Sequence, residues 1–328
     1  RVVVSILDRS QAIKQHKEKL SEYSEVRLAS VAEFLRMCLV ATKSDACIVA
    51  KGEEGRVWAG EIDPSPHLRR LVDSMSCTIM LSGTLSPLPA YELYFFAQEN
   101  RAEKLSLTNS FPAENRLVLV SKTATTLSSR RTDAHNVSEI KGHIRGLIEG
   151  VEGNVALYFT SYGMLEQYRA FCEQCARGAG KRLFCEPREA RRIPSLLRDF
   201  FACATNGGAV MLAVCGGKLS EGIDYVGSSL KGAAVIGLPL SAYTGVQRRI
   251  NQYYVRRYGR ERGMLLAYTL PALNRAMQAL GRVLRSEHDT GVLMLCDSRF
   301  ASPNVAQHLP TWLKEEMVMV DAEGSSLI

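Results

Sequence analysis

The segment QALGRVLRS, residues 278–286, carries side chains that suit phosphate chemistry. It contains one amide and two guanidinium groups, at Gln278, Arg282 and Arg285. On an α-helix, the spacing i, i+4, i+7 places these groups in one row, and two arginines one turn apart can face one phosphate. Gly281 stands beside them, although a glycine in mid-helix costs roughly 1 kcal/mol relative to alanine. A ligand that must come close to the backbone would explain this glycine.

The expected helix, about residues 272–286, has an apolar face opposite this row. The apolar stripe follows helical spacing through Leu273, Ala276, Met277, Leu280, Val283 and Leu284. Pro271 stands where a first-turn proline is tolerated. On this segment alone, a solvated basic face that binds no ligand remains an equal alternative.

Such a helix needs a scaffold, and from residue 116 onward the sequence alternates apolar runs with amphipathic segments. The apolar runs are RLVLV, NVALYF, KRLFCE, AVMLAVC, AAVIGLPL, GMLLAYTL and GVLMLCD. Helical patterns separate most of them, at about 137–149, 165–177, 189–204, 244–258 and 272–286. Continuous apolar strands that alternate with amphipathic helices predict an α/β fold, a parallel sheet covered by helices on both faces. The N-terminal part, about 11–43, is charged and helical in pattern, and a strand-turn-strand follows at 46–60.

Small, hydroxyl and charged residues follow several of the expected strands. They occur after CTIML in SGTLSP (82–87), after NVALYF in Thr160-Ser161-Tyr162, and after AVMLAVC in the run 216–224. In a parallel sheet these strand ends share one edge, where ligands bind. A plain turn explains any one of them, but their concentration at one edge indicates a site.

The composition is ordinary for a globular protein: 328 residues, 46% hydrophobic, with a formal net charge of +7. This charge is compatible with a phosphate-rich partner but does not require one. The sequence contains no run of eighteen apolar residues, so no membrane span is predicted. Nine scattered cysteines indicate a reducing, intracellular location. Cys172 and Cys175 form a single CxxC within a helical pattern, and without a second pair they are not expected to bind metal.

In their order along the chain, these strand ends resemble the later motifs of superfamily 2 helicases. The resemblance is closest to the XPD-like DNA helicases, with the DinG-like enzymes as relatives. SGTLSP is similar to motif III, YFTSY (158–162) to motif IV, GKLSEGIDYVG (217–227) to motif V and QALGRVLRS to motif VI. The strand GVLMLCDSRF also resembles the closing strand of the family, and the whole resemblance covers about 76–312.

The resemblance implies a RecA-like domain, the second motor domain of a two-domain engine in which ATP lies between the domains. The first domain of the family supplies the P-loop, the acidic residues that hold Mg²⁺ and four cysteines for an iron–sulfur cluster. The sequence has neither G-x-x-x-x-G-K-[ST] nor an Asp-Glu pair. We therefore expect the chain to be the C-terminal half of a longer enzyme, with Mg²⁺ and the cluster held by the other half and ATP bound between the two halves. Residues 1–45 would be the tail of an arch-like insertion, and residues 46–328 the second motor domain.

For ATP, the resemblance assigns three residues from motif VI and three from motif V. Arg282 and Arg285 would reach the γ-phosphate as arginine fingers, and Gln278 would bond the nucleotide or the attacking water. The nucleotide-side loop would include Glu221, Gly222 and Asp224. A purely structural role, in which Asp224 caps a turn, remains the alternative for that residue.

For single-stranded DNA, hydroxyl and basic groups near the strand ends are the candidates. They are Thr160, Ser161, Tyr162, Lys218 and Ser220, together with Arg248 and Arg249 from the arginine- and tyrosine-rich segment 241–263. Solvated basic helices are common, so contact by that segment is an open alternative. By analogy with motif III, Ser82, Gly83 and Thr84 would couple the nucleotide to the DNA.

The sequence therefore predicts part of an ATP-dependent 5′–3′ DNA helicase that acts in DNA repair, with nucleotide excision repair as a candidate process. Its partners would be single-stranded DNA, the N-terminal motor domain, and repair or transcription factors. We expect it in the cytoplasm of a prokaryote or the nucleus of a eukaryote. Two alternatives remain: an ATPase-inactive nucleic-acid-binding or regulatory module, and another α/β enzyme such as a sugar-nucleotide transferase.

Overall fold

The computed structural model describes residues 2–19, 27–51, 57–107, 111–220 and 229–324, which divide into two compact units. The first unit consists of 1–80, 89–102 and 242–267, and the second of 81–88, 103–241 and 268–328. These bounds differ from the predicted division at residue 45, because two later segments join the N-terminal one in a single unit. The assignment of domains as an arch-like tail and a motor domain remains a prediction.

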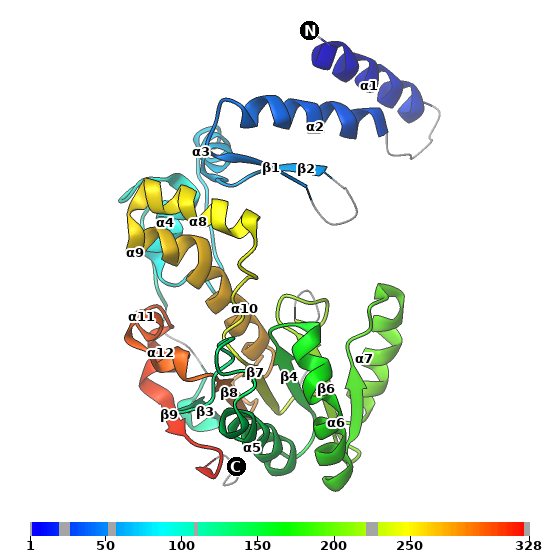
Figure 1. Ribbon diagram of the computed structural model, residues 1–328, viewed down its shortest axis with the longest axis vertical. Helices are drawn as coiled ribbons and strands as arrows, with labels where there is room; N and C mark the ends of the chain where they lie inside the picture. Colours follow the sequence, from blue (N-terminus) through cyan, green and yellow to red (C-terminus); the bar gives the residue numbers. More distant parts are fainter. Residues whose placement is uncertain (1, 20–26, 52–56, 108–110, 221–228, 325–328) are drawn as a thin grey trace. The chain divides into compact units, whose positions relative to one another are not determined.

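The second unit is built on a seven-stranded sheet with the order β5-β6-β4-β7-β8-β3-β9, and every neighbouring pair is parallel (Figure 1). Its strands are β3 (Arg116–Ser121), β4 (Val155–Phe159), β5 (Arg182–Cys185), β6 (Ala209–Val214), β7 (Gly232–Ile236), β8 (Gly291–Cys296) and β9 (Met317–Val320). Strands β4, β6 and β7 are buried at every position. This is why each reads as a continuous apolar run, and the predicted α/β fold is confirmed.

Helices cover both faces of this sheet. Helices α5 (Ala134–Gly150) and α6 (Tyr162–Gly178) pack on one face with Leu119, Leu157 and Phe159. Helices α7 (Ile193–Ala202), α10 (Leu270–Leu280) and α12 (Thr311–Glu316) pack on the other with Val118 and Tyr158. Successive strand residues alternate between the two hydrophobic cores, as the pleat requires. The short helix α11 (Pro303–Ala306) precedes α12.

Among its described residues, the first unit contains six α-helices, of which α9 is the shortest, and a two-stranded antiparallel sheet. The elements are α1 (Val2–Lys19), α2 (Arg27–Ala41), β1 (Cys47–Lys51), β2 (Val57–Glu61), α3 (Ser65–Asp73), α4 (Leu88–Phe96), α8 (Gly245–Tyr258) and α9 (Arg260–Met264). The buried carboxylate of Asp63 accepts a hydrogen bond of 2.6 Å from the Tyr253 hydroxyl. Tyr254 stacks on Tyr94, with ring centroids 6.2 Å apart. No described helix is both long and apolar enough to cross a lipid bilayer.

The predicted strand GMLLAY is wrong, because residues 263–268 are helical. Helix α9 continues into a π-helix, Leu265–Thr269, and then into α10. Pro271 lies in the first turn of α10 and has no N–H to donate. The π-helical turn lies just before this proline. A short apolar run does not distinguish a buried strand from a buried helix by periodicity alone.

The predicted helical row of Gln278, Arg282 and Arg285 is also wrong, because α10 ends at Leu280. Gly281 is its C-terminal cap, and the next two N–H groups bond three residues back, from Arg282 to Ala279 and from Val283 to Leu280. The Asp289 carboxylate then accepts the N–H groups of Arg285 and Ser286, both at 2.8 Å. Gly281 thus suits a helix end, where a Cβ atom would lie 3.0 Å from the Met277 carbonyl oxygen.

The apolar run CTIML, treated as a strand in the sequence, pairs with no described strand. Residues 77–81 lie outside every helix and strand, and the side chains of Ile79 and Leu81 are 81% and 85% exposed. An apolar segment becomes a buried strand only where another strand pairs with it and a layer covers it. Within the described residues, neither condition is met.

Candidate functional site

The carboxyl ends of the parallel strands bring motifs IV and V together. At this edge, the Glu186 side chain follows β5 and reaches across to the ends of β6 and β4. Its carboxylate accepts the N–H groups of Val214 (2.9 Å) and Lys218 (2.8 Å), and it accepts the Tyr162 hydroxyl at 3.3 Å. Burial, and then the charge of Glu186, raise the pKa of Tyr162. One buried carboxylate therefore fixes the start of motif V and the end of motif IV.

Two glycines allow this packing at the start of motif V. Gly216 has φ +73°, and a Cβ atom there would lie 3.3 Å from Cδ of Arg275. A Cβ atom at Gly217 would lie 2.6 Å from Oε1 of Glu186. Arg275, on α10, also donates to the Pro239 carbonyl at 2.6 Å. Glycine is thus needed at both positions because the side chains of Arg275 and Glu186 leave little room for a Cβ atom.

Motif V and motif VI are in direct contact. Nη2 of Arg282 donates to the Ser220 carbonyl oxygen at 3.0 Å. Ser220 is buried, and its hydroxyl donates to the Gly217 carbonyl oxygen at 2.9 Å. Ser220 therefore supports the turn, and its contact with DNA remains a prediction. Lys218 is exposed, and its Nζ donates to the Arg188 carbonyl at 2.6 Å.

The remaining residues predicted for the nucleotide divide into two groups. Gln278 is half-buried on α10, and Arg285 is exposed beyond its end. The predicted residues Glu221, Gly222 and Asp224 lie outside the described part of the chain. The assignment of all these residues to ATP remains a prediction.

The end of β4 presents the three predicted residues of motif IV. Ser161 caps α6, and its hydroxyl accepts the Met164 N–H at 3.2 Å. Thr160 is half-buried, and its hydroxyl lies 3.3 Å from Sδ of Met164. Tyr162 is 39% exposed. These three residues lie at the carboxyl end of β4, and no described contact tests their assignment to DNA.

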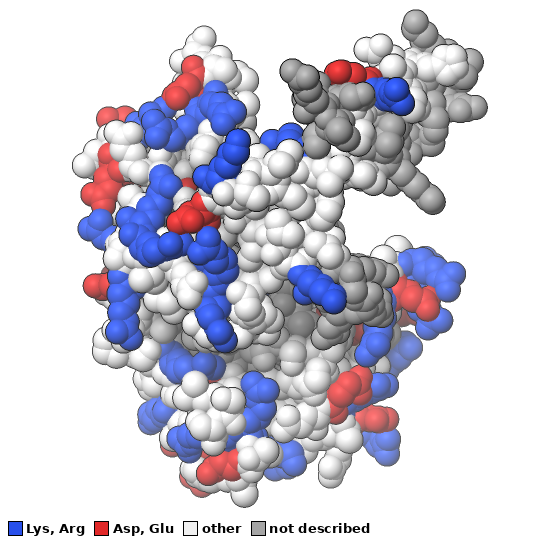
Figure 2. All heavy atoms as spheres, turned by 45° about the horizontal axis from the view of Figure 1, so that its top comes forward, with Lys and Arg blue, Asp and Glu red and all other residues white. Residues whose placement is uncertain are grey.

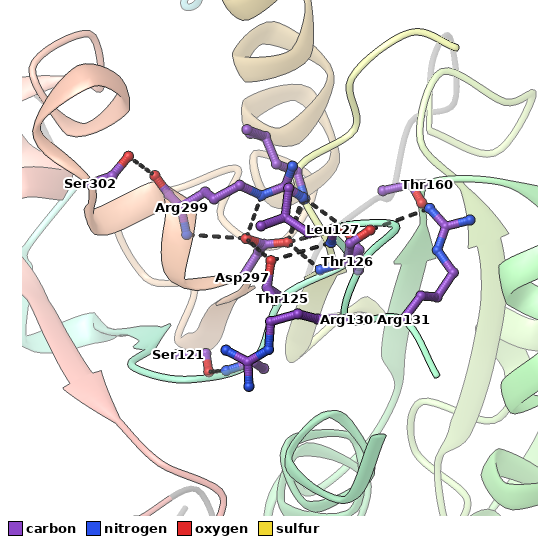
Figure 3. Close-up of polar contacts among 12 residues, drawn as sticks. Ser121, Thr125, Thr126, Leu127, Arg130, Arg131, Thr160, Asp297, Arg299 and Ser302 are labelled. Atoms are coloured by element: carbon purple, nitrogen blue, oxygen red, sulfur yellow. Dashed lines mark hydrogen bonds and ion pairs between the residues drawn. The ribbon is translucent and has the colours of Figure 1, made fainter. Parts of the chain in front are cut away.

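A buried acid, Asp297, organises the neighbouring strand ends (Figure 3). It follows β8 and accepts the N–H of Thr126 at 2.8 Å and the side chain of Arg299 at 2.7 Å. It also accepts the hydroxyl of Thr125 and the N–H of Leu238, both at 3.3 Å. Burial alone would raise the pKa of Asp297, but the hydrogen bonds and charge of Arg299 outweigh it and keep this pKa below its usual range.

Residues 122–133, here called the edge loop, cross the sheet edge from β3 to α5. Asn136 is buried in the first turn of α5 and bonds both the N–H and the carbonyl of Thr125, at 2.8 and 2.9 Å. Thr126 lies directly on the end of β7. There Gly237 has φ +96°, and a Cβ atom would come within 2.5 Å of the Thr126 side chain. The edge loop therefore crosses β8 and β7 and approaches the end of β4.

Motif III keeps a local turn. The Ser82 hydroxyl accepts the Thr84 N–H at 3.2 Å and lies 3.1 Å from the Thr84 hydroxyl. Gly83 has open space where a Cβ atom would be. The coupling role of these residues remains a prediction.

The arginines of α8 lie in the first unit, among acidic and aromatic side chains. Arg249 and Arg256 contact the Asp45 carboxylate at 3.4 and 3.0 Å. Arg248 lies over the Tyr243 ring, 6.0 Å from its centroid. Figure 2 shows acidic side chains interspersed among the basic ones over the visible surface. The assignment of Arg248 and Arg249 to DNA is a prediction that these contacts neither support nor contradict.

The CxxC cysteines are part of the hydrophobic core. Cys172 and Cys175 are buried on α6, and burial raises the pKa of Cys172 to about 12. A thiol must lose its proton to bind metal, so this environment opposes metal binding. Among the described residues, no group of three or more His, Cys, Asp or Glu side chains is arranged to hold a metal ion.

Sequence reasoning missed the two buried acids that hold this edge. The sequence presents Glu186 only as the end of an apolar run, and Asp297 only as part of the segment that resembles the closing strand of the family. A carboxylate directly after a buried strand was the available signal. Its partners could not be identified, because Asp297 and Thr126 are separated by 171 positions in the sequence.

A parallel sheet covered on both faces, with glycine, hydroxyl and arginine residues gathered at its carboxyl edge, defines a RecA-like domain of the kind found in helicase motors. The chain matches the family described as helicase C-terminal domain over residues 144–316, which is more than half of its length. It belongs to this family, and within it to the XPD-like superfamily 2 helicases. The sugar-nucleotide transferase alternative is therefore wrong.

Curated relatives and solved structures agree with this family. The ATP-dependent DNA helicase CHL1 of Meyerozyma guilliermondii is 26% identical over 93% of this chain and 40% of its own length. The regulator of telomere elongation helicase 1 of Rattus norvegicus is 29% identical over 87% of this chain and 24% of its own. A solved XPD helicase matches 97% of this chain and 55% of its own, with 19% identity and a TM-score of 0.64. A solved apo XPD gives 18% identity and a TM-score of 0.62, over 96% of this chain and 61% of its own. The chain thus spans less than half of these curated relatives, and the solved structures support the fold.

Proposed function

We propose that this chain is the second motor domain of an ATP-dependent DNA helicase that moves 5′ to 3′ on single strands and acts in DNA repair. The observation that carries this proposal is the contact between motifs V and VI, 3.0 Å from Arg282 to the Ser220 carbonyl oxygen. This contact joins the motif V loop to the arginine segment of motif VI, and a nucleotide bound between two motor domains would contact both. The relatives described as ATP-dependent DNA helicases support the reaction, whereas polarity and repair rest on the resemblance alone.

Arg285 and Arg282 act as arginine fingers in this proposal, and Gln278 bonds the nucleotide or its attacking water. ATP supplies the phosphoryl group, and the guanidinium groups offset the charge that spreads over its oxygens. Arg285 is exposed, so it can reach a nucleotide held by another domain. Glu221, Gly222 and Asp224 complete the nucleotide-side loop. Thr160, Ser161, Tyr162, Lys218, Ser220, Arg248 and Arg249 contact the DNA, and Ser82, Gly83 and Thr84 couple the two sites.

The N-terminal motor domain of the same enzyme holds the phosphates of ATP, Mg²⁺ and an iron–sulfur cluster in this proposal. The exposed apolar segment 75–81, with Ile79 and Leu81, is a surface for that domain, because exposed apolar patches commonly mark interfaces. Residues 1–45 would belong to an arch-like insertion. Repair or transcription factors would be further partners, in a nuclear or cytoplasmic setting.

The test is ATP hydrolysis by the full-length protein, with and without single-stranded DNA. Arg285→Ala is expected to lower the stimulated rate by roughly 10³-fold or more, the range reported for arginine fingers. Arg177→Ala is the matched control, because its side chain is 80% exposed on α6 and pairs only locally with Glu173. A parental rate in Arg285→Ala would refute the finger assignment. Duplexes with a 5′ or a 3′ single-stranded extension test the polarity.

A second candidate is a nucleic-acid-binding or regulatory module without ATPase activity, which the missing P-loop favours for this chain taken alone. These 328 residues contain no P-loop pattern. If the full-length protein bound single-stranded DNA but hydrolysed no ATP, this candidate would replace the motor.

A further inference from the structure

The edge loop places one arginine, Arg131, beside the end of β4. Nη2 of Arg131 donates to the Thr126 carbonyl oxygen at 3.3 Å. In Figure 3, the Arg131 side chain points toward Thr160, whereas the Arg130 side chain points the other way. The loop is a close neighbour of α6 as well, because the charge of Arg131 acts on Tyr168, whose pKa burial raises to about 12.

The backbone that carries Arg131 is unusually well fixed for an exposed loop. Asp297 bonds the Thr126 N–H and hydroxyl at 2.8 and 3.1 Å, and Asn136 donates to the carbonyl oxygens of Thr125 and Arg130. Both Asp297 and Asn136 are buried. Buried polar groups that are fully bonded rigidify the backbone around them. The guanidinium group is therefore held at the sheet edge at a low cost in loop entropy on binding.

The environment of Arg131 suits an anion. Within the described part of the chain, no carboxylate is ion-paired with Arg131, and its side chain donates a hydrogen bond to the Thr126 carbonyl oxygen. The Thr160 hydroxyl is the polar group toward which it points. An arginine beside a hydroxyl group at a strand end is a common phosphate contact that carries no sequence information.

We propose that Arg131 binds a backbone phosphate of single-stranded nucleic acid together with Thr160, and that Asp297 and Asn136 are positioning residues for it. This inference rests on the proposed nucleic-acid function of the β4 end, and it adds a residue outside the helicase motifs. The edge loop then extends the nucleic-acid contact across the carboxyl ends of β8 and β7 to β4.

The experiment measures binding of fluorescein-labelled oligothymidylate to the full-length protein by anisotropy, over a series of salt concentrations. Each phosphate contact on a single strand contributes about 0.7 to the slope of log K against log salt. Arg131→Ala is expected to reduce this slope by about 0.7 and to weaken binding about tenfold at low salt. Arg130→Ala is the matched control, because it removes the neighbouring guanidinium from the same loop, and its slope should equal that of the parent.

Two further variants separate charge from loop structure. Arg131→Lys keeps the positive charge and should give a salt slope close to that of the parent. Arg131→Gln keeps a donor for the Thr126 carbonyl but loses the charge, so its salt slope should be reduced as in Arg131→Ala. A parental slope in both Arg131→Ala and Arg131→Gln would overturn the inference while leaving the proposed function intact. The inference would also be overturned if the Arg131 variants raised the KM for ATP without changing the salt slope for oligothymidylate. If the parental protein failed to bind the oligonucleotide, the proposed function and this inference would fail together.

Discussion

The arginines of α8 and the arginine of the edge loop carry the same charge in very different surroundings. On α8, Arg249 and Arg256 share the Asp45 carboxylate, and Arg257 contacts buried Asp63 at 3.1 Å. In the edge loop, the buried carboxylate of Asp297 holds the backbone at Thr126 instead, and the Arg131 side chain donates to the Thr126 carbonyl oxygen.

This comparison separates two uses of acidic residues near a basic one. An acid that pairs with the arginine itself reduces the charge available to a nucleic acid. An acid that pairs with the backbone beneath the arginine fixes its position and leaves its charge available. In the sequence, the arginine-rich segment 241–263 is the more obvious DNA-binding candidate. The structure adds the edge loop as a second candidate, because the backbone that carries its arginine is held by a buried acid.

The largest expected effect comes from Asp297→Asn, which removes the charge from the centre of the edge network. Breaking a buried pair typically costs about 3–5 kcal/mol, because the partner charge of Arg299 is left without compensation. We expect the melting temperature of the second unit to fall by roughly 10 °C. We also expect the salt slope for oligothymidylate to fall as in Arg131→Ala, since the loop is no longer held. Scanning fluorimetry and anisotropy on the same preparation measure both.

Asp63→Asn is the matched change in the first unit. It also removes a buried charge, bonded to Tyr253 and Arg257, and should cost about 1.5–3 kcal/mol. Its salt slope should remain parental, because it does not hold the edge loop. If both variants lowered the slope equally, the distinction between the two regions would be lost.

The fold was predictable from the sequence to a large extent, because strands buried on both faces must be apolar at every position. The runs that became β4, β6 and β7 satisfy this condition, and those that became β3 and β8 come close to it. The prediction failed where an apolar pattern has another cause. Val283 and Leu284 are buried beyond the end of α10, so the helical stripe continues through a turn that is not helical. GMLLAY is partly buried in a helical stretch that includes a π-helical turn.

The candidate site was predictable only in part, and mostly from the family resemblance. Motifs IV, V and VI could be placed because short spacings identify them. The contacts of Glu186 and Asp297 could not, since each carboxylate bonds backbone groups that are distant in sequence. Arg131 had no signal of its own, because its significance depends on where the edge loop crosses the sheet.

A smaller effect is expected from pH, through a histidine beneath the edge loop. His143 is fully buried and lies 2.8 Å from the Ser121 hydroxyl, which accepts the Ala124 N–H at 3.0 Å. Burial lowers the pKa of His143 to about 4, against the opposing charges of Glu139 and Asp321. The unfolded chain titrates near its ordinary value of about 6.5 and so binds more protons between those two values. Stability should therefore fall as the pH decreases from 6.5 to about 4, by roughly 3 kcal/mol at most.

Urea unfolding at pH 7 and pH 4.5 measures this loss. His143→Gln keeps a side chain that can bond Ser121 but does not titrate, so its midpoint should change less between the two pH values. Asp297 does not confuse the result. Its pKa is lowered, so its contribution is lost only below about pH 4, the ordinary range of an aspartate. Equal losses in parent and variant would show that His143 is not the titrating group.

The smallest expected effect concerns the arginines of α8, and it tests the other side of the comparison. Asp45→Ala removes the carboxylate shared by Arg249 and Arg256, an exposed pair of contacts worth less than about 1 kcal/mol. If α8 lies along the nucleic acid, the released charge should strengthen oligothymidylate binding about threefold at low salt and steepen the salt slope. We expect this tighter binding in Asp45→Ala, and the double variant Asp45→Ala with Arg249→Ala should lose part of the gain in affinity. No change in either variant would remove Arg248 and Arg249 from the proposed contacts, and the edge of the parallel sheet would remain as the tested surface.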